Sequence, residues 1–164
     1  MDTQTITYYL EMTYPSELRP SRKNGVALDV RRVEIVCPAF NRFFYTQVGQ
    51  NWAWIDRLPW SEEQWLAYLC QPGMETWVGY VAGTPAGYFE LLRQDESHVE
   101  LAYFGLLPQF IGQGVGGQLL TAAIQRAWEM QAARVWVHTC SKDHPNALAN
   151  YTARGFRVYK TEIS

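Results

Sequence analysis

Short apolar runs recur along the chain, several alternating with polar residues and most bounded by turn residues, and this pattern predicts β-strands. The runs cover residues 5–13, 76–81, 86–93, 98–107, 134–140 and 156–161. Polar turns at 82–85 and 95–97 join the second, third and fourth runs, so these three should form an antiparallel meander. Residues 33–37 are also apolar, but their pattern does not distinguish a strand from a helix.

Helices are predicted over residues 39–48, 61–71, 119–130 and 145–154. Pro38 can occupy the first turn of the first helix, where its missing N–H costs nothing. Ser61 and Gln64 have the spacing of a capping box, which marks the start of the second helix. Strands come first and then alternate with helices, which indicates an α/β fold with a mixed sheet.

Composition and charge narrow the class of protein. The chain has 164 residues, of which 48% are hydrophobic and 15% aromatic, so we expect one globular domain over residues 1–164. The formal net charge of -2 gives no electrostatic reason to bind nucleic acid or an anionic membrane. No apolar run approaches a membrane span, and the N-terminal residues lack the features of a signal peptide. We therefore expect a cytoplasmic protein with no nucleic-acid and no membrane partner.

The cysteines and histidines do not indicate a metal site. Cys37, Cys70 and Cys140 are widely spaced and lack the CxxC clustering typical of zinc sites or redox pairs. We expect reduced, largely buried thiols. The histidines likewise lack metal-ligand spacing with acidic residues or cysteines, so no metal is expected.

A glycine-dense turn at residues 112–117 lies within the segment Leu106–Leu120, LLPQFIGQGVGGQLL. The predicted strand 98–107 precedes this turn, and the helical pattern 119–130 follows it. Glycines at such a junction permit φ > 0 and let a ligand approach the backbone, while the first N–H groups of the helix have no intrahelical partner. These amides and the positive end of the helix dipole converge, so the segment predicts an anion-binding cradle.

Two familiar phosphate-binding loops fit this cradle poorly. A nucleotide-triphosphatase loop needs Lys followed by Ser or Thr after its last glycine, whereas Gln118-Leu119 stands here. Gly112, Gly114 and Gly117 satisfy the GxGxxG of dinucleotide-binding enzymes. However, the next strand carries no acidic residue, and too little chain remains for further βα units. A dinucleotide enzyme would bind NAD saturably.

A third loop matches better, that of the GCN5-related N-acetyltransferases (GNAT). Their pyrophosphate motif is Pro-x-x-(Arg/Gln)-Gly-x-Gly-x-Gly/Ala followed by a leucine-rich helix. The segment Pro108–Leu120 resembles this motif, with Ile111 at the usual Arg/Gln position. Residues 143–156 resemble the second signature of the family, Asn-x-x-Ala-x-x-x-Tyr-x-x-x-Gly-Phe, with His144 at the usual Asn position. The resemblance extends over Trp77–Tyr159.

This resemblance implies an α/β fold with a GNAT-like mixed, mostly antiparallel central sheet and helices on both faces. It implies acetyl-CoA as co-substrate, its pyrophosphate bound by the backbone of Gly112, Gln113, Gly114, Val115, Gly116 and Gly117. The strand ending at Leu106 and Leu107 should splay from strand 134–140 and pair with the pantetheine arm by strand addition. His144 and Asn146 are candidate contacts to that arm, although His144 could instead cap the following helix.

Acetyl transfer to an amine requires management of two protons. A lysine-like amine has a pKa of about 10.4, so presenting it neutral at pH 7 costs roughly 4–5 kcal/mol, which a general base reduces. By resemblance Glu100 is the candidate base, with His98 and Tyr103 as alternatives. Tyr151 matches the tyrosine of the family that points at the coenzyme A sulfur, unless it is only a core residue of its helix. Nothing near Cys140 lowers a thiol pKa, so we expect direct attack in a ternary complex.

Neither motif specifies the acceptor. The aromatic-rich segment 52–60 either plugs one end of the core or forms a wall of the acceptor pocket, and both can hold at once. We expect an acetyl-CoA-dependent N-acetyltransferase acting on a small-molecule or peptide amine, with a homodimer left open. The alternative, favoured by Ile111, is a catalytically silent GNAT-like domain that binds acyl-CoA as a sensor or interaction module.

Overall fold

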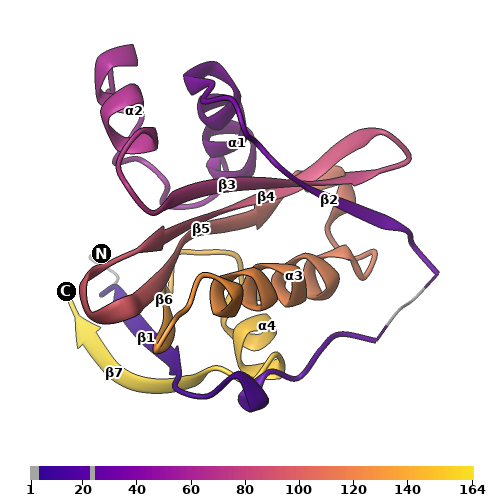
Figure 1. The fold of residues 1–164 in the computed structure, drawn as a ribbon, viewed down its shortest axis with the longest axis vertical. Coiled ribbons are helices and arrows are strands. Elements are labelled where there is room, and N and C mark those ends of the chain that lie inside the picture. Colours follow the sequence, from indigo (N-terminus) through magenta and orange to yellow (C-terminus); the bar gives the residue numbers. More distant parts are fainter. Residues whose placement is uncertain (1–3, 23–24) are drawn as a thin grey trace.

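The computed structural model describes residues 4–22 and 25–164. In this part of the chain seven strands form one sheet, in the order β2-β3-β4-β5-β6-β1-β7 (Figure 1). The strands are β1 (Ile6–Met12), β2 (Leu28–Arg32), β3 (Met74–Val81), β4 (Thr84–Arg93), β5 (His98–Leu106), β6 (Arg134–Cys140) and β7 (Arg157–Ile163). Neighbouring strands are antiparallel except β5 and β6, which run parallel. The predicted meander is confirmed as β3, β4 and β5.

The helices of the described residues cover both faces of this sheet, as predicted (Figure 1). They are α1 (Pro38–Gly49), α2 (Glu62–Leu69), α3 (Val115–Glu129) and α4 (Ala147–Ala153). Adjacent residues of β4 point to opposite faces: Tyr88 stacks on Phe44 of α1 at a ring distance of 4.9 Å, whereas Phe89 packs in a core cluster that includes α3. The mixed, mostly antiparallel sheet is not the doubly wound parallel sheet of dinucleotide-binding enzymes, which removes the NAD alternative.

Two helices begin elsewhere than predicted. α3 begins at Val115, ahead of the predicted start at Leu119, because Gly114 takes the N-cap position with a left-handed φ of 78°. The following glycines therefore lie inside the first helical turn. α4 begins at Ala147, after Pro145, because the backbone N–H of Asn146 donates to Nδ1 of His144 at 3.0 Å in a turn that precedes the helix.

The edge strand β2 was missed by the sequence pattern, because its residues LDVRR are mostly polar and exposed. The ambiguous apolar residues 33–37 lie between β2 and α1 in neither a strand nor a helix, and Ile35 is 83% exposed. The expectation of buried thiols was also wrong, since Cys37 and Cys70 are exposed and Cys140 is half-buried. Cys37 and Cys70 occupy the N-cap of α1 and the C-cap of α2, where the chain reaches solvent.

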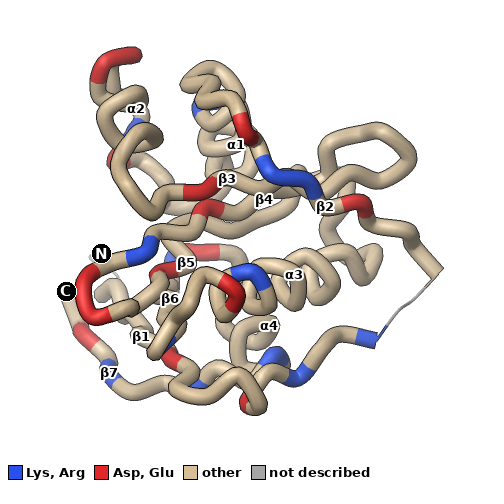
Figure 2. The backbone as a smooth tube through the Cα atoms, in the orientation of Figure 1, with Lys and Arg blue, Asp and Glu red and all other residues tan. Residues whose placement is uncertain are grey.

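The capping box of α2 is confirmed: Ser61 Oγ accepts from the Gln64 N–H, and Gln64 Oε1 accepts from the Ser61 N–H at 2.8 Å. Glu62 and Glu63 follow in the first turn, where the helix dipole favours negative charge. Figure 2 shows basic and acidic positions interspersed over much of the chain, with this acidic turn at one end of α2. No helix within residues 4–22 and 25–164 combines the length and apolarity needed to cross a membrane.

Candidate active site

A gap between β5 and β6 is the centre of the candidate site. Only His98–Glu100 of β5 pair with Arg134–Trp136 of β6 in the described chain; beyond them the strands separate. β5 continues to Leu106 paired with β4, so its peptide groups on the other edge face the gap without a ladder partner among the described residues. The predicted splay is therefore confirmed. A cleft of about 670 Å³ is lined by residues on both sides of this gap.

The glycine turn lies at one end of the cleft, which Ile111, Gly112, Gly116 and Gly117 line. Gly112 has a φ of 84°, in the left-handed region that other residues rarely adopt. A Cβ built on Gly112 would meet no described heavy atom within 4 Å, so the backbone there is open to a ligand. The N-cap residue of α3, Gly114, has no side chain to bond the first amides of the helix, and amides at such a position can bind a phosphate group.

Several predicted cofactor contacts lie behind this surface. Leu106 lines the cleft, whereas the Leu107 N–H donates to the Ala86 carbonyl at 2.8 Å. Val115 is fully buried in a small core cluster with Ala86 and Phe110, and this packing holds the turn against the rest of the protein. Gln113 Nε2 donates to the Gln109 carbonyl at 2.8 Å, which stabilises the turn itself. Leu107, Gln113 and Val115 are not among the residues that line the cleft, and their side chains support the turn.

Arg154 is a basic residue beside this turn that the sequence interpretation did not single out. Its Nη1 lies 3.1 Å from the position that a Cβ on Gly117 would occupy. Its buried Nε has no hydrogen-bond partner in the described part of the chain. Ile111, at the position where the family motif has Arg or Gln, is 36% exposed and supplies no charge. Arg154, from the end of α4, therefore brings a positive charge to the first turn of α3.

Tyr151 of α4 lines the cleft and is 5% exposed. Its ring lies between Phe104 of β5, at a centroid distance of 6.1 Å, and Phe156, at 6.0 Å. Burial, and then the nearby Asp143 carboxylate, raise the pKa of its hydroxyl well above the ordinary value. The hydroxyl is therefore protonated at neutral pH and able to donate a hydrogen bond into the cleft. Tyr151 is therefore both a member of the core cluster and a residue of the cleft wall.

Glu100 lines the cleft where β5 and β6 begin to separate. Gln94 Nε2 donates to Glu100 Oε1 at 3.0 Å, and Trp136 Nε1 donates to Gln94 Oε1 at 3.0 Å, which holds the amide in place. His138 Nε2 lies 3.8 Å from Glu100 Oε2. Burial raises the pKa of the Glu100 carboxyl above its usual value, against the opposing effects of His138, Arg57 and Gln94. Of the alternative bases, Tyr103 lines the cleft, whereas His98 is not among the residues that line it.

The segment between α1 and α2 reaches the loop that follows β6. Trp54 Nε1 donates to Asp143 Oδ1 at 2.8 Å, and Thr139 Oγ1 donates to Asp143 Oδ2 at 2.9 Å. Trp52 contacts His144 edge-on at a ring distance of 4.9 Å. His144 and Asn146 both line the cleft. The aromatic segment therefore forms part of the cleft wall.

Elsewhere the same segment packs into the core. Trp60 lies edge-on to the fully buried Trp65 at 5.0 Å. Ile55 and Leu58, by contrast, are 62% and 57% exposed. Trp60 thus fits the core interpretation, whereas Trp52 and Trp54 line the cleft, and a role for them at the acceptor stays a prediction.

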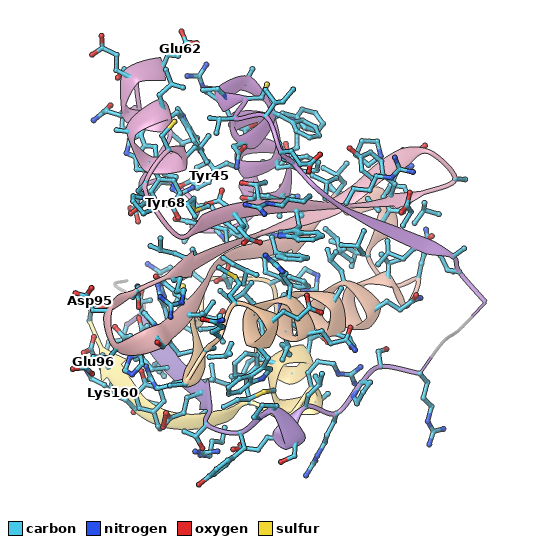
Figure 3. The ribbon with its side chains drawn as sticks, viewed as in Figure 1. Tyr45, Glu62, Tyr68, Asp95, Glu96 and Lys160 are labelled. Carbon is cyan, nitrogen blue, oxygen red and sulfur yellow. The ribbon has the colours of Figure 1, made fainter. Side chains whose placement is uncertain are left out.

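A buried ion pair, absent from the sequence interpretation, lies at the other end of the cleft. Arg57 Nη1 donates to both carboxylate oxygens of Glu90, at 3.0 and 3.1 Å, and the two side chains are 5% and 0% exposed. Asn41 Nδ2 also donates to Glu90, at 3.2 Å. The guanidinium lies 4.0 Å from the ring centre of Tyr68 and 4.1 Å from that of Tyr103. Figure 3 shows Tyr68 on the side of the sheet that α1 and α2 cover.

A single acid inside an apolar strand, AGYFELL, was the available sequence signal for this pair. A charge at such a position is almost always paired, because burying it alone is very unfavourable. The partner could not be found the same way, since Arg57 lies outside the strands, in the loop between α1 and α2.

Comparisons with known proteins agree with this geometry. A family model described as the acetyltransferase (GNAT) family matches residues 34–156. The chain belongs to this family. An uncharacterized N-acetyltransferase of Mycobacterium tuberculosis (strain H37Rv) is 30% identical over 101 residues, which are 62% of this chain and 64% of that protein. The match therefore spans less than two thirds of the length of this curated relative.

Solved structures show the same GNAT fold. A GCN5-related N-acetyltransferase from Sphaerobacter thermophilus superposes with a TM-score of 0.70 at 14% identity, over 97% of this chain and 50% of that one. A Bacillus subtilis acetyltransferase solved in complex with CoA superposes with a TM-score of 0.62 at 18% identity, over 82% of this chain and 79% of that one. The mixed, mostly antiparallel GNAT sheet expected from the sequence motifs is confirmed.

Proposed function

We infer that this chain is an N-acetyltransferase that transfers an acetyl group from acetyl-CoA to a primary amine. The observation that carries the proposal is one cleft that joins the open N-terminus of α3 to Tyr151 and Glu100. GNAT membership supports acetyl transfer as the reaction class. The CoA complex of the Bacillus subtilis relative supports CoA as the ligand of the cradle.

The chain offers a distinct group for each part of acetyl-CoA. The backbone from Gly112 to Gly117 would bind the diphosphate, with Arg154 adding positive charge beside it. The unpaired edge of β5 up to Leu106 would bind the amide-rich pantetheine arm by strand addition. His144 and Asn146 line the opposite wall. Acetyl-CoA supplies the acetyl group as a thioester, which is already activated for transfer to an amine.

Glu100 assists the attacking amine, and Tyr151 assists the leaving thiolate. As the N–C bond forms, the Glu100 carboxylate accepts a proton from the amine, and burial makes it a stronger base than an exposed glutamate. As the C–S bond breaks, the protonated Tyr151 hydroxyl donates a hydrogen bond to the sulfur. The half-exposed His138 lies beside this carboxylate, with its Nε2 3.8 Å from Glu100 Oε2. Thiolate is a good leaving group, so a hydrogen bond is sufficient help.

One alternative is a domain that binds acyl-CoA without catalysis. The apolar Ile111 at the Arg/Gln position of the motif favours it. Both functions require CoA binding, so binding alone does not separate them.

The test measures acetyl-CoA binding by calorimetry and CoA thiol release with a panel of primary amines. Amine-dependent thiol release above the rate with acetyl-CoA alone is expected. Binding of acetyl-CoA with no acceleration by any amine would overturn the enzymatic proposal and support the binding domain. No binding by folded protein would overturn both.

A further inference from the structure

The acceptor end of the cleft has a distinctive balance of charge. We define this end by Asp56, Arg57, Tyr68, Glu100, Tyr103 and His138, all of which line the cleft. Arg57 is its only Lys or Arg side chain, and Glu90 already neutralises that charge. Among the described residues Asp56 forms no ion pair, and Glu100 has only His138, at 3.8 Å, as a basic neighbour within ion-pair distance. Asp56, which is exposed, and Glu100, which Arg57 influences only from beyond ion-pair distance, therefore remain without a salt bridge to Lys or Arg at this end of the cleft.

Arg57 is poorly placed to bind a carboxylate from an acceptor. Its Nη1 is occupied by both oxygens of Glu90. The Tyr68 and Tyr103 rings lie about 4 Å from its guanidinium carbon, at 4.0 and 4.1 Å. A second carboxylate reaching this guanidinium would also lie in the same end of the cleft as Asp56 and Glu100, where like charges repel; the half-buried Glu100 is less screened by solvent than the exposed Asp56.

The remaining walls suit an apolar body. Trp54 packs edge-on to Tyr103 at 4.9 Å, and its indole N–H is already occupied by Asp143. Tyr9 and Leu92 add further apolar surface from β1 and β4. Aromatic faces also attract a cation that comes to lie over them.

We propose that the acceptor is a small primary amine whose ammonium is its only charge, carried on an apolar or aromatic body, and that α-amino acids are rejected. This inference rests on the proposed function, because it names the substrate class of the same cleft. Asp56 and Glu100 attract the ammonium form, which releases one proton to solvent before attack, and Glu100 takes the second proton as the N–C bond forms.

Three probes of one size class test the charge rule: phenethylamine, phenylalanine and phenylalanine methyl ester. Thiol release with acetyl-CoA should give a kcat/KM for phenethylamine at least about 100-fold above that for phenylalanine, because the carboxylate would face two others. The methyl ester should recover most of the loss. The pKa of the α-amino group of an amino acid is lower than that of an alkylamine, so more of phenylalanine is in the reactive neutral form at neutral pH. A difference in basicity therefore cannot produce the expected preference for phenethylamine.

Two outcomes would overturn the inference and leave the enzyme intact. One is equal or faster thiol release with phenylalanine. The other is a kcat/KM for the methyl ester as low as that for phenylalanine, which would show that the cleft discriminates by size and not by charge.

If acetyl-CoA binds but no amine promotes thiol release, the proposed function fails. The inference about the acceptor is then tested by the binding of the two amines. Phenethylamine, but not phenylalanine, should then raise the melting temperature of the CoA-loaded protein. Equal shifts, or no shift with either compound, would overturn it.

A matched pair of variants locates the effect. Asp56→Asn should narrow the preference for phenethylamine over phenylalanine by about 5- to 10-fold, through KM more than kcat, because one attracting charge is lost. Asp29→Asn removes a carboxylate from the edge strand β2, outside the cleft, and should leave the ratio unchanged. An unchanged ratio in Asp56→Asn would overturn the electrostatic argument.

Discussion

Replacing Tyr151 with phenylalanine should separate a catalytic role from a structural one. The substitution deletes a single hydroxyl and keeps the ring that packs between Phe104 and Phe156. Burial and the Asp143 charge account for the raised pKa of this hydroxyl, with no hydrogen bond to any described residue. Tyr151→Phe therefore breaks no internal hydrogen bond, and the free energy of unfolding should change by less than about 0.5 kcal/mol.

The rate should respond very differently. Loss of the hydrogen bond to the departing sulfur should lower kcat about 10²- to 10³-fold, which corresponds to roughly 3–4 kcal/mol of transition-state stabilisation. Acetyl-CoA binding measured by calorimetry should stay within about threefold, because the diphosphate and the pantetheine arm are held by other residues. Thiol release and urea denaturation on the same preparation give both quantities.

Tyr45→Phe is the matched control. The Tyr45 hydroxyl accepts the backbone N–H of Arg57 at 3.0 Å in a buried setting. Its removal leaves that N–H unpaired and should cost about 1–3 kcal/mol of stability. A kcat for Tyr151→Phe within about threefold of the parent protein would refute the role at the sulfur. A loss of stability as large as that of Tyr45→Phe would show that the Tyr151 hydroxyl has a structural partner.

Three further predictions concern the base, the buried ion pair and the cradle. Glu100→Gln should lower kcat about 10²-fold. Burial raises the pKa of Glu100 in the folded protein above its value in the unfolded chain, so the folded protein binds this proton more tightly. The free energy of unfolding of the parent protein should therefore fall, relative to that of Glu100→Gln, as the pH rises from the unfolded pKa through the folded pKa. Urea denaturation at a series of pH values measures this difference. Arg57→Met leaves the fully buried Glu90 carboxylate without its cation, although Asn41 still donates to it, and should lower the free energy of unfolding by about 3–5 kcal/mol in urea denaturation. Adding Glu90→Gln should recover part of this loss, and full additivity of the two changes would contradict the pairing. A side chain is placed at a left-handed φ by both Gly114→Ala (78°) and Gly83→Ala (81°), and each change should lower the free energy of unfolding by about 1–2 kcal/mol. Only Gly114→Ala should also weaken CoA binding measured by calorimetry.

Local features of the sequence were sufficient for much of the fold. The β3–β5 meander and the glycine turn before α3 depend on residues close together in the chain, so periodicity and turn residues predict them. Tyr151 was found through a motif whose spacing places it on a short helix before Gly155 and Phe156. Errors arose where the local pattern was weak, as in the polar strand β2.

The sequence by itself thus determined the order of the strands and helices apart from β2, the glycine turn before α3 and the family motifs, because each is set by neighbours within a helical turn or a strand. Only the tertiary structure decided which distant side chains share the cleft. Arg57 and Glu90 are 33 positions apart and Trp54 and Asp143 are 89 apart, and their pairing follows from the sheet order and the packing of the segment between α1 and α2. Periodicity carries no information about such contacts, since they depend on how whole elements are placed, and the acceptor end of the cleft is built from them.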